Sequence, residues 1–247
     1  MKNQYVGDIG DYGKYGMLRF LAEHGIKIGV NWYLTKNDGS KDGKHITYLD
    51  NAKERIYDPI VYDALKELAN RPDKTVHMVE SADIIPGAFY YHALLATGDL
   101  PWKQRRQERE RWHGQAMEEL REVRLVFADP DNGTIGNKRP EDKGAEKYVL
   151  QEELADYYRR GQNIVYYCQR GRWTEAKWKA KRAEMHELLP DAKICVLTFH
   201  RGTQRAYVFV VHPEEYERYY DLLTEFVNTA WGTAGKKKAF EFEDIII

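Results

Sequence analysis

Two carboxylates and an amide follow an apolar run within five residues. The segment Asp129-Pro130-Asp131-Asn132-Gly133 comes directly after Leu125-Val126-Phe127-Ala128. Asp, Asn and Gly favour turns on conformational grounds, so a plain turn accounts for Asp131 and Asn132. It accounts less well for Asp129, because an acid that closes a buried strand is costly to desolvate unless it meets a cation, a donor or a substrate. We take Asp129, Asp131 and Asn132 as the candidate catalytic residues.

Glycines, acids and tyrosines alternate near the N-terminus, at residues 5–15. This segment holds three glycines, two acids, a lysine and three tyrosines, and it leads into a helical pattern. The glycines permit close approach to a ligand, and Asp11 is the expected N-cap. The alternative is an ordinary capped helix, and the spacing fits neither a Rossmann nor a P-loop signature. The candidate substrate-binding residues here are Tyr5, Asp8, Asp11, Tyr12, Lys14 and Tyr15.

A polar loop follows the first predicted strand, at residues 35–43. In a doubly wound sheet a nucleotide cofactor would lie at this position, which makes Asn37 and Asp38 candidate binding residues. The loop lacks the closely spaced glycines that let a backbone wrap adenosylmethionine. An ordinary Asp-Gly loop explains it equally well.

Basic and aromatic side chains are interleaved at residues 170–182. Arg170, Arg172 and Trp173 begin this stretch, and further lysines and a second tryptophan continue it. Such a pattern suits a nucleic-acid backbone together with a stacked base. A solvated helix face is an equally good explanation.

Strand and helix patterns alternate along most of the chain. Apolar runs rich in β-branched and aromatic residues predict strands at 26–34, 75–80, 124–128, 163–168, 193–199 and 205–212. Helical spacing of apolar residues predicts helices at 12–24, 58–69, 102–121, 145–160, 174–189 and 214–229.

This order predicts an α/β fold of Rossmann-like type, with a mainly parallel sheet and helices on both faces. The last two strands are joined by a connection too short for a parallel crossover, so they should form a C-terminal antiparallel edge hairpin, as in class I methyltransferases. We expect a single domain over residues 1–247. From about residue 232 the chain is expected to form either a basic turn with a final strand or a loose tail.

Composition narrows the class of protein. Hydrophobic residues make up 43% and charged residues 31% of the 247 residues, which excludes global disorder. Apolar runs are too short to cross a membrane, and the N-terminus lacks the apolar core of a signal peptide, so we expect a cytoplasmic protein. Cys168 and Cys195 are expected to be buried free thiols. The net charge of −1 means that a nucleic-acid partner would be met by a local patch.

The motifs also carry a resemblance. The chain resembles a family of largely uncharacterised bacterial and phage proteins over most of its length. The resemblance rests on Gln4-Tyr5-Val6-Gly7-Asp8, on the segment at 11–16 and on Phe127 to Gly133. More distantly, the order of parts resembles the ribosomal RNA adenine-N6 methyltransferases, which implies a class I methyltransferase-like fold. Their Gly-x-x-x-Asp-x-x-Lys segment is matched by Gly7, Asp11 and Lys14, and the start of their Asp-Pro-Pro-aromatic motif by Asp129 and Pro130.

The same comparison shows a departure. Asp131 and Asn132 stand where those enzymes have proline and the aromatic residue that stacks on the flipped base. A second carboxylate suits activation of water, stabilisation of an oxocarbenium-like sugar or binding of a divalent cation better than it suits methyl transfer.

These features together predict a hydrolase that acts on nucleic acid, DNA rather than RNA, preferably by base excision in the manner of a glycosylase and without a required cofactor. Because the family that the chain resembles is spread through bacteria and phages, the resemblance implies a role in antiviral defence, for example the removal of modified bases from phage DNA. The first alternative is an S-adenosylmethionine-dependent nucleic-acid methyltransferase, with the cofactor near Gly7, Asp38 and Gly39. A magnesium-dependent nuclease and a non-catalytic binding protein are further alternatives.

Overall fold

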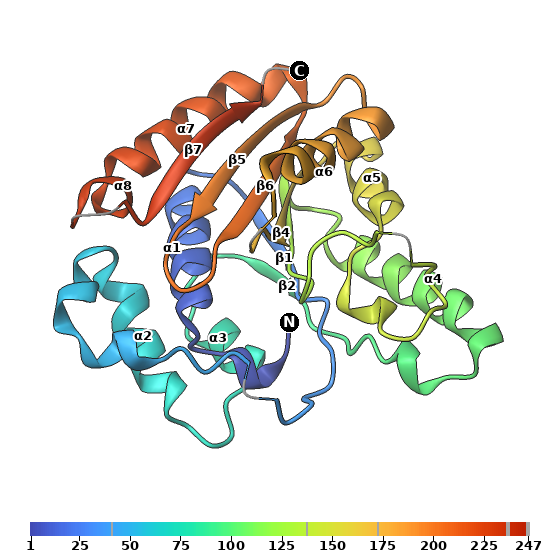
Figure 1. The fold of residues 1–247 in the computed structure, drawn as a ribbon, viewed down its shortest axis with the longest axis horizontal. Coiled ribbons are helices and arrows are strands. Elements are labelled where there is room, and N and C mark those ends of the chain that lie inside the picture. The colour runs from blue at the N-terminus through green and yellow to red at the C-terminus, as the bar shows by residue number, and fades with distance from the viewer. Residues whose placement is uncertain (41, 137, 172, 236–237, 246–247) are drawn as a thin grey trace.

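A seven-stranded sheet forms the centre of the molecule (Figure 1), giving a mixed α/β fold. The computed structural model describes residues 1–247 except 41, 137, 172, 236–237 and 246–247. The strands are β1 (Ile28–Asn31), β2 (Phe89–Tyr91), β3 (Leu125–Ala128), β4 (Asn163–Gln169), β5 (Lys193–Phe199), β6 (Arg205–Val211) and β7 (Phe240–Ile245). Their spatial order is β2-β1-β3-β4-β6-β5-β7.

Strand direction brings several loops to one edge of the sheet. β2, β1, β3 and β4 pair in parallel, so their carboxyl ends lie at the same edge. β6 is antiparallel to both β4 and β5, and its first residues therefore lie at that edge too. The turn between β5 and β6 completes this rim.

The predicted antiparallel hairpin of β5 and β6 is confirmed on one side of the sheet, although β7 and not the hairpin forms the outermost strand there. β6 lies between β4 and β5, and β7 pairs with the outer side of β5. Every residue of β6 is buried, which is typical of an interior strand with both faces covered. The C-terminal residues Phe240–Ile245 thus belong to the sheet.

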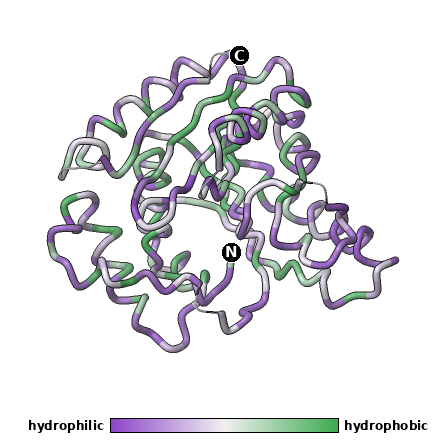
Figure 2. Tube along the Cα trace, viewed as in Figure 1, coloured by the Kyte–Doolittle hydropathy of each residue, from purple (hydrophilic) through white to green (hydrophobic). Residues whose placement is uncertain are grey.

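Helices cover both faces of the sheet. They are α1 (Ile9–Glu23), α2 (Pro59–Ala69), α3 (Val76–Ser81), α4 (Trp102–Glu119), α5 (Gln151–Arg159), α6 (Glu175–Leu188), α7 (Tyr216–Asn228) and α8 (Ala230–Thr233). Leu125 and Phe127 of β3 face a core shared with α1, α2, α3 and α7, whereas Val126 and Ala128 face a second core shared with α4, α5 and α6. Figure 2 shows α4 as largely hydrophilic, in keeping with the few buried residues on this helix.

Two predicted elements differ from the structure. Residues 75–80, predicted as a strand, form α3, in which Val76 and Val79 are buried at helical spacing. The adjacent strand is the three-residue β2, which the sequence did not reveal. The helix predicted at 145–160 begins only at Gln151, because Ala145–Lys147 forms a separate 3₁₀ turn.

Two composition-based expectations concern the core and the membrane. Cys168 and Cys195 are free and buried, as predicted, and burial raises the pKa of the Cys168 thiol to about 12. Across the described part of the chain, none of the helices combines the length and apolar character needed to cross a bilayer.

Candidate functional site

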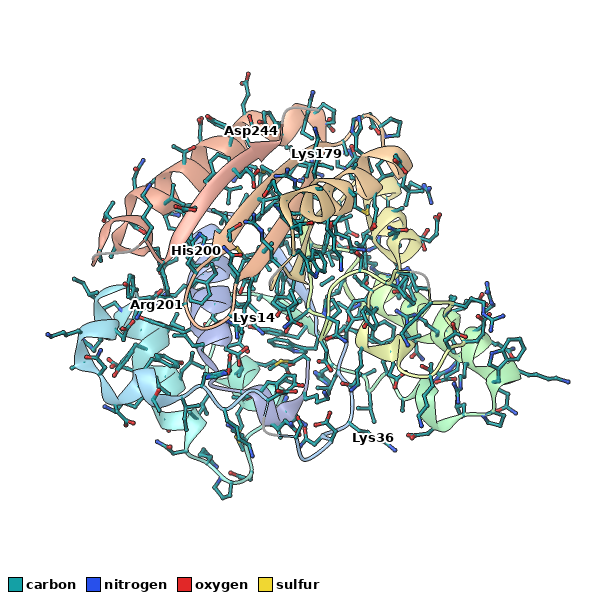
Figure 3. All side chains as sticks on the ribbon, in the orientation of Figure 1. Lys14, Lys36, Lys179, His200, Arg201 and Asp244 are labelled. Carbon is teal, nitrogen blue, oxygen red and sulfur yellow. The ribbon has the colours of Figure 1, made fainter. Side chains whose placement is uncertain are left out.

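A pocket of about 240 Å³ opens at the sheet edge where the strand ends meet. Asp129 to Asn132 line it after β3, the start of α1 lines a second side, and Asp42, Gly43 and His45 line a third. Thr203 and Arg205 reach it from the β5–β6 turn, which also carries the labelled His200 and Arg201 in Figure 3. The Asp129 loop and the N-terminal segment, which hold the candidate catalytic and substrate-binding residues, therefore meet at one pocket.

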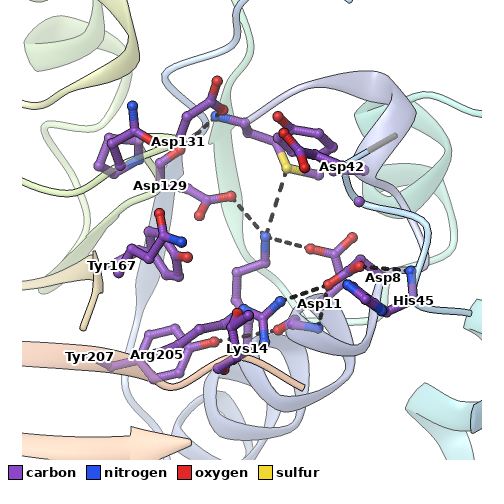
Figure 4. Close-up of a pocket in the computed structure, with 18 residues that line it drawn as sticks. Asp8, Asp11, Lys14, Asp42, His45, Asp129, Asp131, Tyr167, Arg205 and Tyr207 are labelled. Atoms are coloured by element: carbon purple, nitrogen blue, oxygen red, sulfur yellow. Dashed lines mark hydrogen bonds and ion pairs between the residues drawn. The ribbon is translucent and has the colours of Figure 1, made fainter. Parts of the chain in front are cut away.

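Lys14 lies at the centre of this pocket (Figure 4). Its Nζ is 2.7 Å from Asp129 Oδ2 and 2.7 Å from Asp11 Oδ1, and all three side chains are buried. The ammonium also lies 5.3 Å from the ring centroid of Trp32. Burial alone would lower the pKa of Lys14, but Asp11 and Asp129 outweigh it and hold the pKa above its ordinary value. Lys14 is therefore a fixed positive charge between two carboxylates.

Asp131 is held by a second set of cations. Its Oδ1 lies 2.8 Å from the Met1 ammonium and its Oδ2 lies 2.9 Å from Lys2 Nζ. Thr35 Oγ1 donates a further hydrogen bond of 3.3 Å to Oδ2. Burial would raise the pKa of this carboxyl, but the two ammonium groups hold it below its ordinary value. Asp131 is thus an ionised anchor for the N-terminal residues.

Asp8, and not the predicted Asp11, caps α1. Asp8 Oδ1 accepts from Gly10 N at 2.9 Å and pairs with Arg205 Nη2 at 2.9 Å, and its Oδ2 accepts from His45 N. Asp11 lies inside the helix and accepts from Gly7 N at 3.1 Å. The cap position falls earlier because the helix itself begins at Ile9.

Of the three tyrosines predicted to bind substrate, Tyr5, Tyr12 and Tyr15, Tyr5 borders the pocket. Tyr5 lines it, and its hydroxyl accepts from Lys2 Nζ at 2.8 Å. Tyr12 and Tyr15 are 1% and 0% exposed and pack into the core against Tyr48 and Trp32. Burial places Tyr12 and Tyr15 in the core and not among the substrate-binding residues, because Asp11 and Lys14 occupy the face of α1 that meets the pocket.

Two other tyrosines line the pocket in their place. Tyr167 pairs across the strands with Tyr207, and Gln169 pairs with Arg205 in the same register. All four residues line the pocket. Sequence reasoning missed them, although one signal was present: a strand that returns from a hairpin starts at the edge where the parallel strands end, and alternate residues share a face.

Asn37 and Asp38 support the N-terminal segment from outside the pocket. Asn37 Oδ1 accepts from Gln4 N at 3.1 Å, and Asp38 Oδ2 lies 3.1 Å from Lys2 Nζ. Hydrogen bonds from Ser40 and Lys2 keep the pKa of Asp38 well below its ordinary value. Asp38 is connected to the pocket through Lys2, which bridges Asp38 and Asp131.

The basic and aromatic stretch lies beyond the pocket lining. Arg170 pairs with Glu175 at 3.1 Å and lies over the Trp178 ring, and Trp173 packs beside the same ring. Arg172 lies outside the described residues. Because Gln169 lines the pocket and Arg170 is the next residue, this surface continues from the pocket wall.

Four of the carboxylates that line the pocket, from Asp8, Asp11, Asp129 and Asp131, form ion pairs with described residues. Within the described residues, the His, Cys, Asp and Glu side chains whose ligand atoms converge sufficiently for a metal ion are His77, Glu80 and His92, and none of them lines the pocket. Lys14 pairs with Asp11 and Asp129, and Arg205 pairs with Asp8.

Comparison with known proteins adds a structural neighbour. No protein-family model and no curated protein sequence matches the chain. The structure is similar to the crystal structure of protein LPL1258 from Legionella pneumophila, of the family DUF519, with a TM-score of 0.46 and 10% sequence identity. The similarity covers 97% of this chain and 98% of that one.

Proposed function

We propose that this chain is a nucleic-acid-acting hydrolase that attacks a nucleotide at the Asp129 pocket, with base excision as the reaction. The observation that carries the proposal is the Asp129 carboxylate, held by Lys14 at 2.7 Å on a pocket bordered by Tyr5, Tyr167 and Tyr207. At about 240 Å³ the pocket is smaller than the range of about 300–1,000 Å³ typical of drug-sized ligands. A single extruded base with its sugar suits this space and these aromatic walls.

Asp129 would act on the attacking water or on the sugar cation. In the proposed reaction the glycosidic C–N bond breaks, its electron pair leaves with the base, and a water oxygen bonds to the sugar carbon. Asp129 stabilises the positive charge on the sugar and takes the proton released by water, which then passes to the departing base. Lys14 keeps the carboxylate in place, and Asn132 and Asp8 position the nucleotide.

The charges of the lining support this reaction. Five carboxylates line the pocket, from Asp8, Asp11, Asp42, Asp129 and Asp131. Among the described residues, Lys14, Arg205 and the Met1 ammonium line the pocket as positive groups and Lys2 pairs with Asp131 from behind, so acids exceed these cations by one. An excess of negative charge favours a sugar that becomes positive and disfavours phosphate inside the pocket. Backbone phosphates would then lie outside it, toward Arg170, and the resemblance to a bacterial and phage family suggests a defence role against modified phage DNA.

The test compares wild type with Asp129→Asn on plain and modified phage DNA. Released bases and abasic sites are measured by mass spectrometry, with and without adenosylmethionine or magnesium. We expect excision without either addition and a loss of about 10²–10⁴-fold in the variant. Asp63→Asn, at an exposed position, is the control and should keep full activity. Absence of excision from every DNA, or excision unchanged in Asp129→Asn, would overturn the proposal.

A methyltransferase is the second candidate, and the sheet order supports it. The antiparallel β6 between β4 and β5 suits the Rossmann-like, class I methyltransferase type of sheet. The space beside the end of β1, where adenosylmethionine would lie, is occupied by Met1, and this opposes the methyltransferase function. Met1 N donates to Tyr33 O at 3.2 Å and to Asp129 O at 2.9 Å, and Thr35 N donates to Met1 O. A gain of one methyl group in the DNA, only with adenosylmethionine present, would establish this function instead. Strand cleavage only with magnesium would identify a nuclease.

A further inference from the structure

Two histidines and a glutamate converge away from the pocket, beside β2. His77 and Glu80 lie three residues apart on α3, and His92 directly follows β2. His77 Nδ1 lies 3.0 Å and His92 Nδ1 lies 3.1 Å from Glu80 Oε2. One ligand atom from each residue lies within 4.8 Å of the other two.

We propose that His77, Glu80 and His92 bind a divalent transition-metal ion of the zinc class. Zinc takes histidine nitrogens at about 2.0–2.1 Å and carboxylate oxygens at about 2.0–2.2 Å, and two such ligands of one ion lie about 3 Å apart. The separations of 3.0 and 3.1 Å meet this requirement with little movement. Two imidazoles and one carboxylate favour zinc over magnesium or calcium, which prefer sites made of oxygen alone.

The carboxylate is oriented by a buried donor, as metal ligands commonly are. Trp32 Nε1 donates a hydrogen bond of 2.7 Å to Glu80 Oε1, which leaves Oε2 facing the two histidines. The Glu80 side chain is 8% exposed, whereas His77 and His92 are 74% and 56% exposed. One ligand is therefore fixed from the protein interior, and solvent reaches the ion from the histidine side.

The site joins two elements at the β2 edge of the sheet. A turn in which Asp83 and Gly87 have positive φ angles links α3 to the start of β2, and His92 follows the end of that strand. A metal held by both sides would clamp this turn. The ring centroid of Trp32, which orients Glu80, also lies 5.3 Å from Lys14 Nζ, so a bound metal would help to fix the buried ring that packs behind this lysine.

Calorimetric titration of the untagged, metal-free chain with zinc chloride, and separately with magnesium chloride, tests the proposal. We expect one zinc per chain, no measurable magnesium binding at these residues, and a rise in thermal stability with zinc. His77→Ala and His92→Ala should each weaken zinc binding by at least about tenfold, and the double variant should lose the site. His24→Ala removes an exposed histidine from the end of α1 and should bind zinc as wild type does.

Because both histidines are exposed, their replacement should leave the fold intact, which circular dichroism checks. Glu80→Gln provides a second variant that keeps a partner for Trp32 while removing the charge, and it too should weaken zinc binding. A wild-type chain that binds no zinc, or a double variant that binds zinc as tightly as wild type, would overturn the proposal.

Discussion

Lys14 and Asp129 form a buried ion pair of 2.7 Å across 115 residues of sequence. The pair joins the first helix to the end of the interior strand β3, and Asp11 contacts the same ammonium. Two buried carboxylates thus share one cation. Lys14 therefore contributes both to the stability of the fold and to the balance of charge in the pocket.

Replacing that cation should destabilise the fold strongly. Lys14→Met leaves Asp11 and Asp129 buried without their shared partner, and removing one member of a buried pair costs about 3–5 kcal/mol. Adding Asp129→Asn to Lys14→Met should recover part of this loss, because one of the two stranded charges is removed. Urea denaturation of the two single variants and the double variant measures the coupling. Strictly additive losses would show that the pair has no energetic linkage.

The pKa of Asp131 predicts a specific dependence of stability on pH. Its folded-state pKa is depressed by Met1 and Lys2 despite burial, so its stabilising contribution is complete above the unfolded value of about 3.9 and is lost as pH falls through the folded value. We therefore expect the stability difference between wild type and Asp131→Asn to be constant from about pH 5 to 7 and to shrink below about pH 4. Denaturation curves across this range measure it. A difference that grows on acidification would contradict the assigned direction.

Tyr5 and Tyr12 should respond to substitution in opposite ways. Tyr5 borders the pocket, so Tyr5→Ala should weaken DNA binding while leaving most of the fold stability. Tyr12 is 1% exposed, and its hydroxyl donates to Glu54 O and accepts from Asp58 N. Tyr12→Ala should cost about 3–5 kcal/mol of stability. Binding titrations together with thermal unfolding separate the two effects, and equal loss of stability in both variants would show that Tyr5 is structural.

The sequence predicted part of the fold and part of the pocket. Apolar runs and helical spacing located most elements, and the acid at the end of β3 pointed to the pocket, because burial patterns and strand ends are local properties. Which face of α1 meets the pocket was not local information: Tyr12 and Asp11 are neighbours, yet only packing against Tyr48 and Trp231 decides that the tyrosine points inward. Arg205 likewise reaches Asp8 only because β6 inserts beside β4, which the chain order does not reveal.

Two helix glycines offer a test of the packing between α1 and the C-terminal elements. A Cβ added at Gly16 would lie 2.2 Å from Cζ2 of the Trp231 ring, whereas one added at Gly114 in α4 would meet nothing within 4 Å. Gly16→Ala should therefore destabilise the fold by about 1–3 kcal/mol through overpacking against a rigid ring. Gly114→Ala should instead stabilise it by about 0.5–1 kcal/mol, because alanine loses less backbone entropy in a helix. Chemical denaturation of both variants gives the two signs directly, and a stabilising Gly16→Ala would mean that α1 does not pack on Trp231 as described.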